Sequence, residues 1–96
     1  MSLSEFWKVI DDQIEELKSA KTADDVLRIL ANDRDPNGYG GGGSDGFFAG
    51  SGGDDGVDDA LSAAGWRFVS GDRYSYVMKA PNGDKIRYCE GDIYRM

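Results

Sequence analysis

The sequence contains no histidine and a single cysteine, Cys89. One cysteine forms no internal disulfide, and without histidine it supplies too few ligands for a zinc cage. The absence of histidine also excludes the Ser-His and Cys-His nucleophile systems and removes the commonest general base. We therefore expect a protein that is not an enzyme and holds no metal or other cofactor. We interpret Cys89 as a buried structural thiol rather than a nucleophile.

Long apolar runs are missing as well. No apolar stretch approaches the ~20 residues that a membrane-spanning helix needs. The opening residues, from Met1 to Trp7, have neither the basic region nor the apolar region of a secretory signal. These two absences predict a soluble protein of the cytoplasm that does not engage membranes.

The negative charge is unevenly distributed along the 96 residues, which have a net charge of −7. Residues 1–37 contain nine acidic and five basic side chains, residues 38–59 five acidic and no basic ones, and residues 60–96 four acidic and six basic ones. The overall sign argues against general binding to DNA or anionic lipid, since those surfaces attract lysine and arginine. The positive excess of the last segment is far below the footprint of a nucleic-acid-binding module.

The first third of the chain predicts two amphipathic helices, over residues 2–20 and 23–32. In the first helix, apolar residues recur every three or four positions, at Leu3, Phe6, Trp7, Ile10, Ile14 and Leu17. Ser2 and Glu5 fit a capping box for this helix, and Thr22 is a suitable N-cap for the second. Because the link between the helices is short, we expect an antiparallel helical hairpin.

Residues 38–56 form a glycine-rich segment in which ten of nineteen residues are glycine. Glycine loses more backbone entropy on ordering than any other residue, so the segment predicts a flexible loop. Phe47 and Phe48 differ from their surroundings, because two adjacent phenylalanines are costly to leave in water. We expect one or both of them to dock on the core.

A short third helix is predicted over residues 57–64. Asp54 or Asp55 is expected to cap its N-terminus, and Gly65 to end it. The region holds four aspartates, Asp54, Asp55, Asp58 and Asp59. We interpret this cluster as a solvated helix start rather than as a metal site or a mimic of DNA phosphates.

From Trp66 onward the apolar pattern changes to a period of two, which predicts β-strands. Gly71-Asp72 fits a two-residue hairpin turn, and Pro81-Asn82-Gly83 and Glu90-Gly91-Asp92 are further turn signals. The predicted fold is a single α+β domain over residues 1–96. It consists of the N-terminal helical hairpin, the Gly-rich loop, the short helix, and then a three- to four-stranded antiparallel β-meander packed on the helices.

Asp33, Asp35 and Asn37, followed by Gly38, match the start of an EF-hand calcium loop. The bidentate glutamate expected at loop position twelve is Ser44 here, and more glycine follows where a helix should begin. We therefore interpret the segment as a β-turn that leaves the second helix, with calcium binding as the alternative.

Six of the eleven aromatic residues fall on the predicted sheet, interleaved with lysine and arginine. Six exceed what one face of three short strands must bury, so we expect some tyrosines to be exposed. Tyrosine, tryptophan and arginine dominate protein interfaces, although RNA-binding sheets also combine aromatics with cations. The sequence thus predicts a partner-binding surface and favours a protein over nucleic acid. Its candidate residues are Trp66, Arg73, Tyr74, Tyr76, Arg87 and Tyr94.

Several short blocks of sequence, spread over most of the chain, carry a resemblance to one group of proteins. They are residues 5–11 (EFWKVID), 20–26 (AKTADDV), 47–54 (FFAGSGGD), 64–66 (AGW) and 90–95 (EGDIYR). These blocks resemble small uncharacterised proteins of actinobacteriophages, of the mycobacteriophage-like kind. The resemblance implies a phage product in the bacterial host cytoplasm and implies no activity.

Together these observations predict a non-catalytic phage accessory protein that binds a protein partner, namely a host protein. The alternative is an acidic nucleic-acid mimic or a nucleic-acid-associated protein, for which Asp11, Asp12, Glu15 and Glu16 supply further negative charge. The sheet also needs an end strand, and such an edge permits a homodimer.

Overall fold

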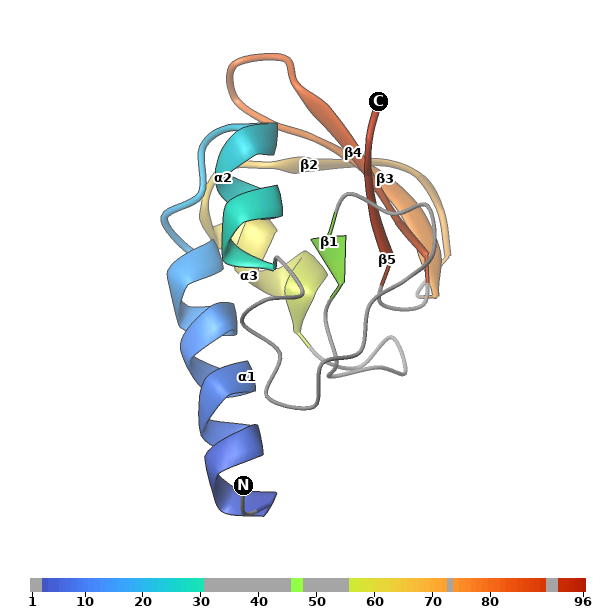
Figure 1. Ribbon diagram of the computed structural model, residues 1–96. Coiled ribbons are helices and arrows are strands. Elements are labelled where there is room, and N and C mark those ends of the chain that lie inside the picture. Colours follow the sequence, from blue (N-terminus) through green and yellow to red (C-terminus); the bar gives the residue numbers. More distant parts are fainter. Residues whose placement is uncertain (1–2, 31–45, 48–55, 73, 90–91) are drawn as a thin grey trace.

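The computed structural model describes residues 3–30, 46–47, 56–72, 74–89 and 92–96. The helices are α1 (Leu3–Leu17), α2 (Ala23–Ile29) and α3 (Val57–Ala63). The strands are β1 (Gly46–Phe47), β2 (Arg67–Gly71), β3 (Ser75–Lys79), β4 (Lys85–Cys89) and β5 (Asp92–Arg95). They form one antiparallel sheet in the order β1-β5-β4-β3-β2. The helices lie on one face of this sheet, so the α+β prediction is confirmed (Figure 1).

Helices α1 and α2 contact each other through a short connection and a buried polar side chain. The Gln13 side chain is almost fully buried and donates a 3.0 Å hydrogen bond to the carbonyl of Ile29. This bond gives the buried Gln13 amide an acceptor and links the middle of α1 to the end of α2. Thr22 caps α2 as predicted, because its Oγ1 accepts a 3.1 Å hydrogen bond from the Asp25 amide. Ser2 of the predicted capping box lies outside the described residues.

Helix α3 differs from the prediction at its start and agrees with it at its end. Its N-cap is Gly56, which has no side chain, so the predicted aspartate cap is wrong. At the C-terminus, Gly65 has a φ of +98°, and the Trp66 amide donates to the Leu61 carbonyl at 3.0 Å. This 6→1 bond is the Schellman motif that a glycine after the helix predicts.

The turn between β2 and β3 begins one residue later than the sequence signal predicts. β2 and β3 are joined through residues 72–74, and Gly71 is still paired with Tyr76. The predicted turn at Gly71-Asp72 is therefore wrong. The Asp72 carboxylate instead accepts hydrogen bonds from the amides of Tyr74 and Ser75, at 2.8 and 3.0 Å, and these bonds form the turn one residue later.

The turn between β3 and β4 occurs where the sequence predicts it. At residues 80–84 the Gly83 amide donates to the Ala80 carbonyl at 2.9 Å, and Asn82 Oδ1 accepts the Asp84 amide at 2.9 Å. Cys89 and Asp92 are direct partners across β4 and β5, and residues 90–91 of the predicted turn lie outside the described residues.

The core lies between the helices and one face of the sheet. The buried sheet residues are Tyr76, Met78, Ile86, Tyr88 and Ile93. The rings of Tyr76 and Tyr88 stack with their centroids 4.9 Å apart. Trp66 is buried as well, and its Nε1 donates a 2.8 Å hydrogen bond to the carbonyl of Ala20. The start of β2 is thereby fixed to the connection between α1 and α2.

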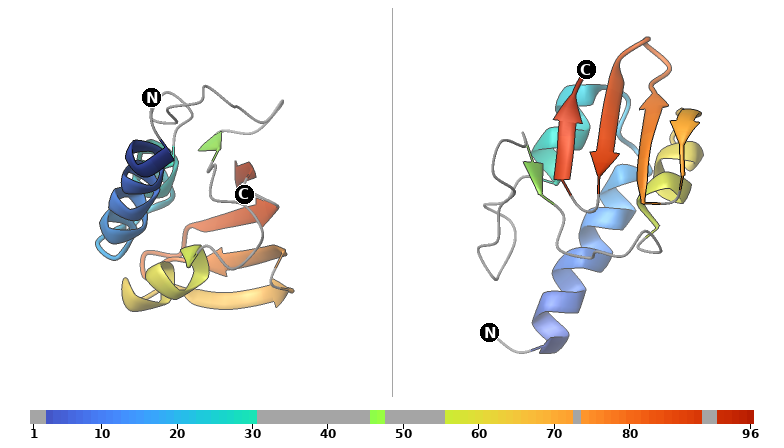
Figure 2. Two further views of the ribbon diagram at one scale, coloured as in Figure 1. Left: turned by 90° about the horizontal axis from the view of Figure 1, so that it is seen from below. Right: turned by 90° about the vertical axis from the view of Figure 1, so that its right-hand side faces the viewer.

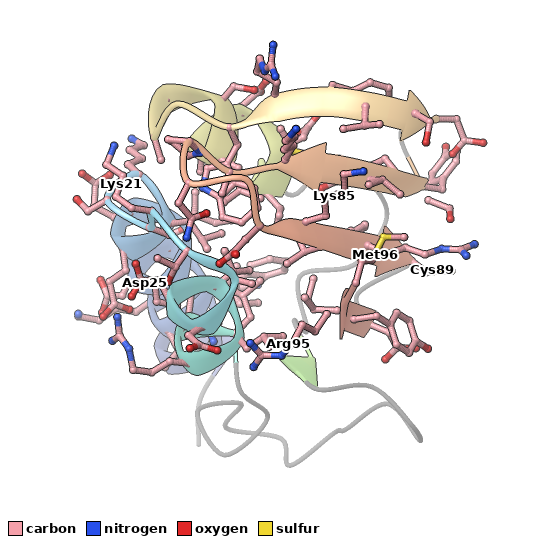
Figure 3. All side chains as sticks on the ribbon, turned by 90° about the horizontal axis from the view of Figure 1, so that it is seen from above. Lys21, Asp25, Lys85, Cys89, Arg95 and Met96 are labelled. Carbon is pink, nitrogen blue, oxygen red and sulfur yellow. The ribbon has the colours of Figure 1, made fainter. Side chains whose placement is uncertain are left out.

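Polar contacts also fasten α2 to the sheet. Asp84 Oδ2, in the turn between β3 and β4, accepts a 3.0 Å hydrogen bond from the Ala23 amide. Arg95 of β5 forms an ion pair with Asp24 of α2, and Figure 3 shows Arg95 beside that helix. These contacts join residues far apart in the sequence and hold the helical layer against one face of the sheet.

Most of the predicted Gly-rich loop lies outside the described residues, and so do Asp33, Asp35, Asn37 and Phe48. Within that segment, the backbone of Gly46–Phe47 pairs with β5 and adds a fifth strand to the expected meander. Across the described ranges, none of the helices has the length and hydropathy that crossing a membrane requires.

Candidate functional site

Among the residues that the structure describes, no helix lies on one face of the sheet. Figure 2 (right) looks onto this uncovered face, with the strands in front and the helices behind them. Residues directly opposite each other on antiparallel strands share a face. Arg67, Lys79 and Lys85 are such partners across β2, β3 and β4, and their chain neighbours Met78 and Ile86 point into the core. The three cations, here called the basic row, therefore lie on the uncovered face.

A second row on the same face is more apolar. It consists of Val77, Arg87 and Tyr94, which are direct partners across β3, β4 and β5. Val77 and Tyr94 are half-buried and Arg87 is exposed. Arg87 Nη2 lies 3.5 Å from Ser75 Oγ, at the limit of a hydrogen bond. Cys89 lies farther along this face and is half-buried, so the expectation of a buried thiol is met only in part.

A hollow of about 320 Å³ lies at the β2 edge of the sheet. Its lining consists of Arg67, Phe68, Val69, Lys79 and Lys85. Phe68 is 53% exposed and Val69 is 48% exposed. Cationic and apolar groups therefore lie side by side around one concave surface.

Strand β2 forms the edge of the sheet beside this hollow. All five of its residues are exposed, and the register with β3 shifts between Phe68 and Ser70. Phe68 pairs with Met78 and so belongs to the helix-covered face, where its ring centroid lies 6.0 Å from that of Tyr76. The edge thus presents a row of cations toward one face and an accessible aromatic ring toward the other.

The basic row differs electrostatically from the cations of the helices. On the helical side, Lys8 pairs with Asp12 and Lys18 with Glu15, each at 2.9 Å. The residues of the basic row make no ion pair within the ranges that the structure describes. Like charges directly opposite each other on adjacent strands are destabilising, typically by about 0.2–1 kcal/mol per pair. An anionic ligand would remove this repulsion.

Not all of the predicted contact residues reach the surface. Trp66 and Tyr76 are each only 3% exposed, so their assignment to a contact surface is wrong, because both side chains belong to the core. Arg73 lies outside the described residues. Tyr74 is 46% exposed at the turn between β2 and β3. Of the six predicted residues, the structure brings Arg87 and Tyr94 together as direct cross-strand partners.

The sequence prediction missed the basic row and the exposed pair Phe68 and Val69. A signal for the row was present, because Lys79 and Lys85 flank the predicted turn at residues 81–83 symmetrically. A hairpin closed by that turn places the two lysines opposite each other, as the structure does. Arg67 then joins them through the pairing of β2 with β3.

The ionisable groups with shifted pKa values have structural roles. The pKa of Asp84 is lowered because its carboxylate accepts the Ala23 amide and a hydrogen bond involving Asn82. The pKa of Asp72 is lowered by the amides of Tyr74 and Ser75. In both cases backbone donors stabilise the charged form in a turn.

The uncovered face therefore has the character of a contact surface. No set of three or more His, Cys, Asp or Glu side chains gathers as metal ligands would within residues 3–30, 46–47, 56–72, 74–89 and 92–96. The hollow is lined by cations and apolar groups, which suit the binding of an anionic or amphipathic partner. Comparison of the chain with protein-family models, with curated proteins and with solved structures finds no match.

Proposed function

We propose that the protein is a non-catalytic binding module that engages a protein partner through the uncovered face of its sheet. The observation that carries this proposal is the division of the sheet into a face covered by three helices and a face that combines cations with Val77 and Tyr94. Arginine and tyrosine contribute strongly to binding energy at protein interfaces, particularly where apolar groups surround them.

The partner that we propose is a host protein, and the module a phage accessory protein acting in the bacterial cytoplasm. The support for this part is the resemblance of several sequence blocks to small actinobacteriophage proteins. A chain of 96 residues without histidine is suited to acting through binding rather than through its own chemistry.

A nucleic-acid-associated role is the second candidate, and the basic row is the observation that favours it. Arg67, Lys79 and Lys85 on a sheet surface are suited to contact phosphates, and Tyr94 to stack on a base. The exposed acids of α1, Asp11, Asp12, Glu15 and Glu16, favour the related role of an acidic nucleic-acid mimic. Both roles predict steeply salt-dependent binding.

A pull-down from an actinobacterial lysate, with and without nuclease, tests the proposal. Three tagged baits are compared, namely the wild type, the double variant Arg87→Gln/Tyr94→Ala and the control variant Lys18→Gln. Lys18 is exposed and lies near the end of α1. We expect one host protein to be retained after nuclease by the wild type and the control and to be lost with the double variant. Loss of all prey after nuclease supports the second candidate, and equal retention by the double variant excludes this face.

A further inference from the structure

We infer that the outer edge of β2 binds an extended, acidic segment of a protein partner as an additional strand, with carboxylates of that segment against the basic row. This inference rests on the proposed function and specifies the chemistry of the partner. It is carried by three features that meet at β2, namely an available strand edge, a row of uncompensated cations and an accessible aromatic ring.

The strand edge is available along the whole length of β2. β2 is the last strand in the sheet order, and no other strand of the described ranges pairs with its outer side. The opposite edge is β1, which has two residues, whereas β2 has five. An exposed edge offers backbone donors and acceptors to an extended segment, a common mode of peptide recognition.

The charge of the edge selects the segment. In an added strand, side chains alternate between the two faces of the sheet. Those on the uncovered face would lie beside Arg67 and above the hollow of about 320 Å³ that Lys79 and Lys85 also line. Carboxylates at these positions would lie next to Arg67, and Lys79 and Lys85, one and two strands farther on, would extend toward them along the hollow. None of the three cations has an acidic partner among the described residues.

The opposite side of the added strand meets a different surface. There Phe68, with 53% of its surface exposed, lies beside Tyr76 on the helix-covered face. Apolar side chains of the bound segment would cover this ring. The segment inferred from both faces therefore alternates acidic and apolar residues.

The net charge of −7 does not prevent such binding at physiological salt. Exposed charges are screened over about 8 Å at that ionic strength. The acidic side chains of α1 belong to the helical layer on the other side of the sheet (Figure 2). The local field at the hollow is set mainly by Arg67, Lys79 and Lys85.

A second copy of the chain fits this edge less well than an acidic segment does. Two-fold pairing of β2 with β2 would place both basic rows on one continuous face and so add cations rather than carboxylates beside β2. The irregularity between Phe68 and Ser70 also limits indiscriminate strand pairing, as bulges on exposed edges commonly do. Charge, in addition to backbone pairing, then decides which segment binds.

Fluorescence anisotropy with defined ligands tests the inference. The ligand is a fluorescein-labelled heptapeptide, Glu-Val-Glu-Tyr-Glu-Val-Glu, compared with the same peptide carrying glutamine for glutamate and with a single-stranded 12-mer oligonucleotide. We expect the glutamate peptide to bind at least tenfold more tightly than the glutamine peptide and to weaken as salt is raised. Lys79→Gln should weaken binding about three- to fivefold, a typical loss for one exposed charge pair, and Lys18→Gln should leave it unchanged.

The position of the bound peptide is checked by NMR of the labelled protein. We expect the amide signals of residues 67–70 to shift and their hydrogen exchange to slow on addition of the glutamate peptide. Equal affinity for the glutamine peptide, insensitivity to Lys79→Gln, or shifts away from β2 overturn the inference. Tighter binding of the oligonucleotide with the same sensitivity to Lys79→Gln overturns it in favour of nucleic acid. A dimer in solution whose concentration-dependent amide shifts lie at residues 67–70 overturns it in favour of a second copy.

Failure of this inference is distinguishable from failure of the proposed function. A host protein that is captured by the wild type, lost with Arg87→Gln/Tyr94→Ala and retained by Lys79→Gln keeps the proposed function and overturns the inference. Absence of any nuclease-resistant protein partner overturns the proposed function itself.

Discussion

Gly71 and Gly83 form a matched pair in which a single added methyl group should have very different effects. Both have positive φ, +111° at Gly71 and +96° at Gly83. A Cβ atom at position 71 would lie 2.2 Å from the carbonyl oxygen of Ser75 and 2.6 Å from the Cα of Tyr76. A Cβ atom at position 83 would have no other atom within 4 Å. Backbone strain is common to the two sites, whereas the steric overlap occurs only at Gly71.

The structure sets the expected cost of each substitution. A non-glycine residue at positive φ costs about 1–2 kcal/mol, which is the whole expected effect of Gly83→Ala. At Gly71 the overlapping atoms belong to the backbone, so relief requires opening the end of the β2–β3 hairpin. Losing backbone hydrogen bonds there costs about 1–3 kcal/mol more. We expect Gly71→Ala to lower the free energy of unfolding by about 2–5 kcal/mol, a large part of the stability of a small domain.

Thermal and urea unfolding followed by circular dichroism measure both variants. For a domain of this size about 1 kcal/mol corresponds to a Tm change of about 4–8 °C. Gly83→Ala should therefore remain folded with a modestly lower Tm, whereas Gly71→Ala should lose at least twice as much or fail to fold. Equal destabilisation of the two variants would refute the reasoning, since it would mean that the approach of Ser75 and Tyr76 to Gly71 has no energetic consequence.

Three further predictions concern other contacts. Trp66→Phe removes the buried hydrogen bond to the Ala20 carbonyl and should lower the free energy of unfolding by about 1–3 kcal/mol; an unchanged urea midpoint would contradict this. Lys79→Gln removes the positive charge that faces both Arg67 and Lys85, so the Tm should rise at low salt. The rise should be smaller in 0.5 M NaCl, and a lower Tm at low salt would contradict the prediction. The folded-state pKa of Asp84 lies below its ordinary value of 3.8, so its stabilising contribution is present above pH 3.8 and is lost as the pH falls through the lowered value. Asp84→Asn should therefore lose less stability between pH 6 and pH 3 than the wild type does, as urea unfolding at both pH values would show.

The fold class was predictable because the local signals agreed with one another. Thr22 caps α2, Gly65 ends α3, and the change to a period of two marks the start of the sheet. The displaced turn after Gly71 was not predictable from composition, because it depends on which backbone amides the Asp72 carboxylate accepts. Local sequence signals thus predicted which helices and strands form, whereas side-chain hydrogen bonds decided the residues at which some of them end.

The candidate site was predictable only in part. A period of two divides each strand into two faces but does not say which face the helices cover. The sequence therefore does not distinguish Tyr76 from Tyr94, since both are tyrosines in predicted strands. The structure buries Tyr76 in the core and leaves Tyr94 half-buried on the uncovered face. The basic row depends on cross-strand register, which the turn at residues 81–83 sets for Lys79 and Lys85. Register also explains why residues of three separate strands lie together on one surface.

The polar contacts between α2 and the sheet have a consequence for the order of events during synthesis. The helices that leave the ribosome first are secured by strands that leave it last, since Asp84 contacts the start of α2 and Arg95 pairs with Asp24. The apolar stripe of α2 is therefore fully covered only once the C-terminal strands are present. Contacts of such long sequence separation slow folding. A nascent chain that stalls before β5 would expose this stripe and become a substrate for chaperones or proteases of the cell.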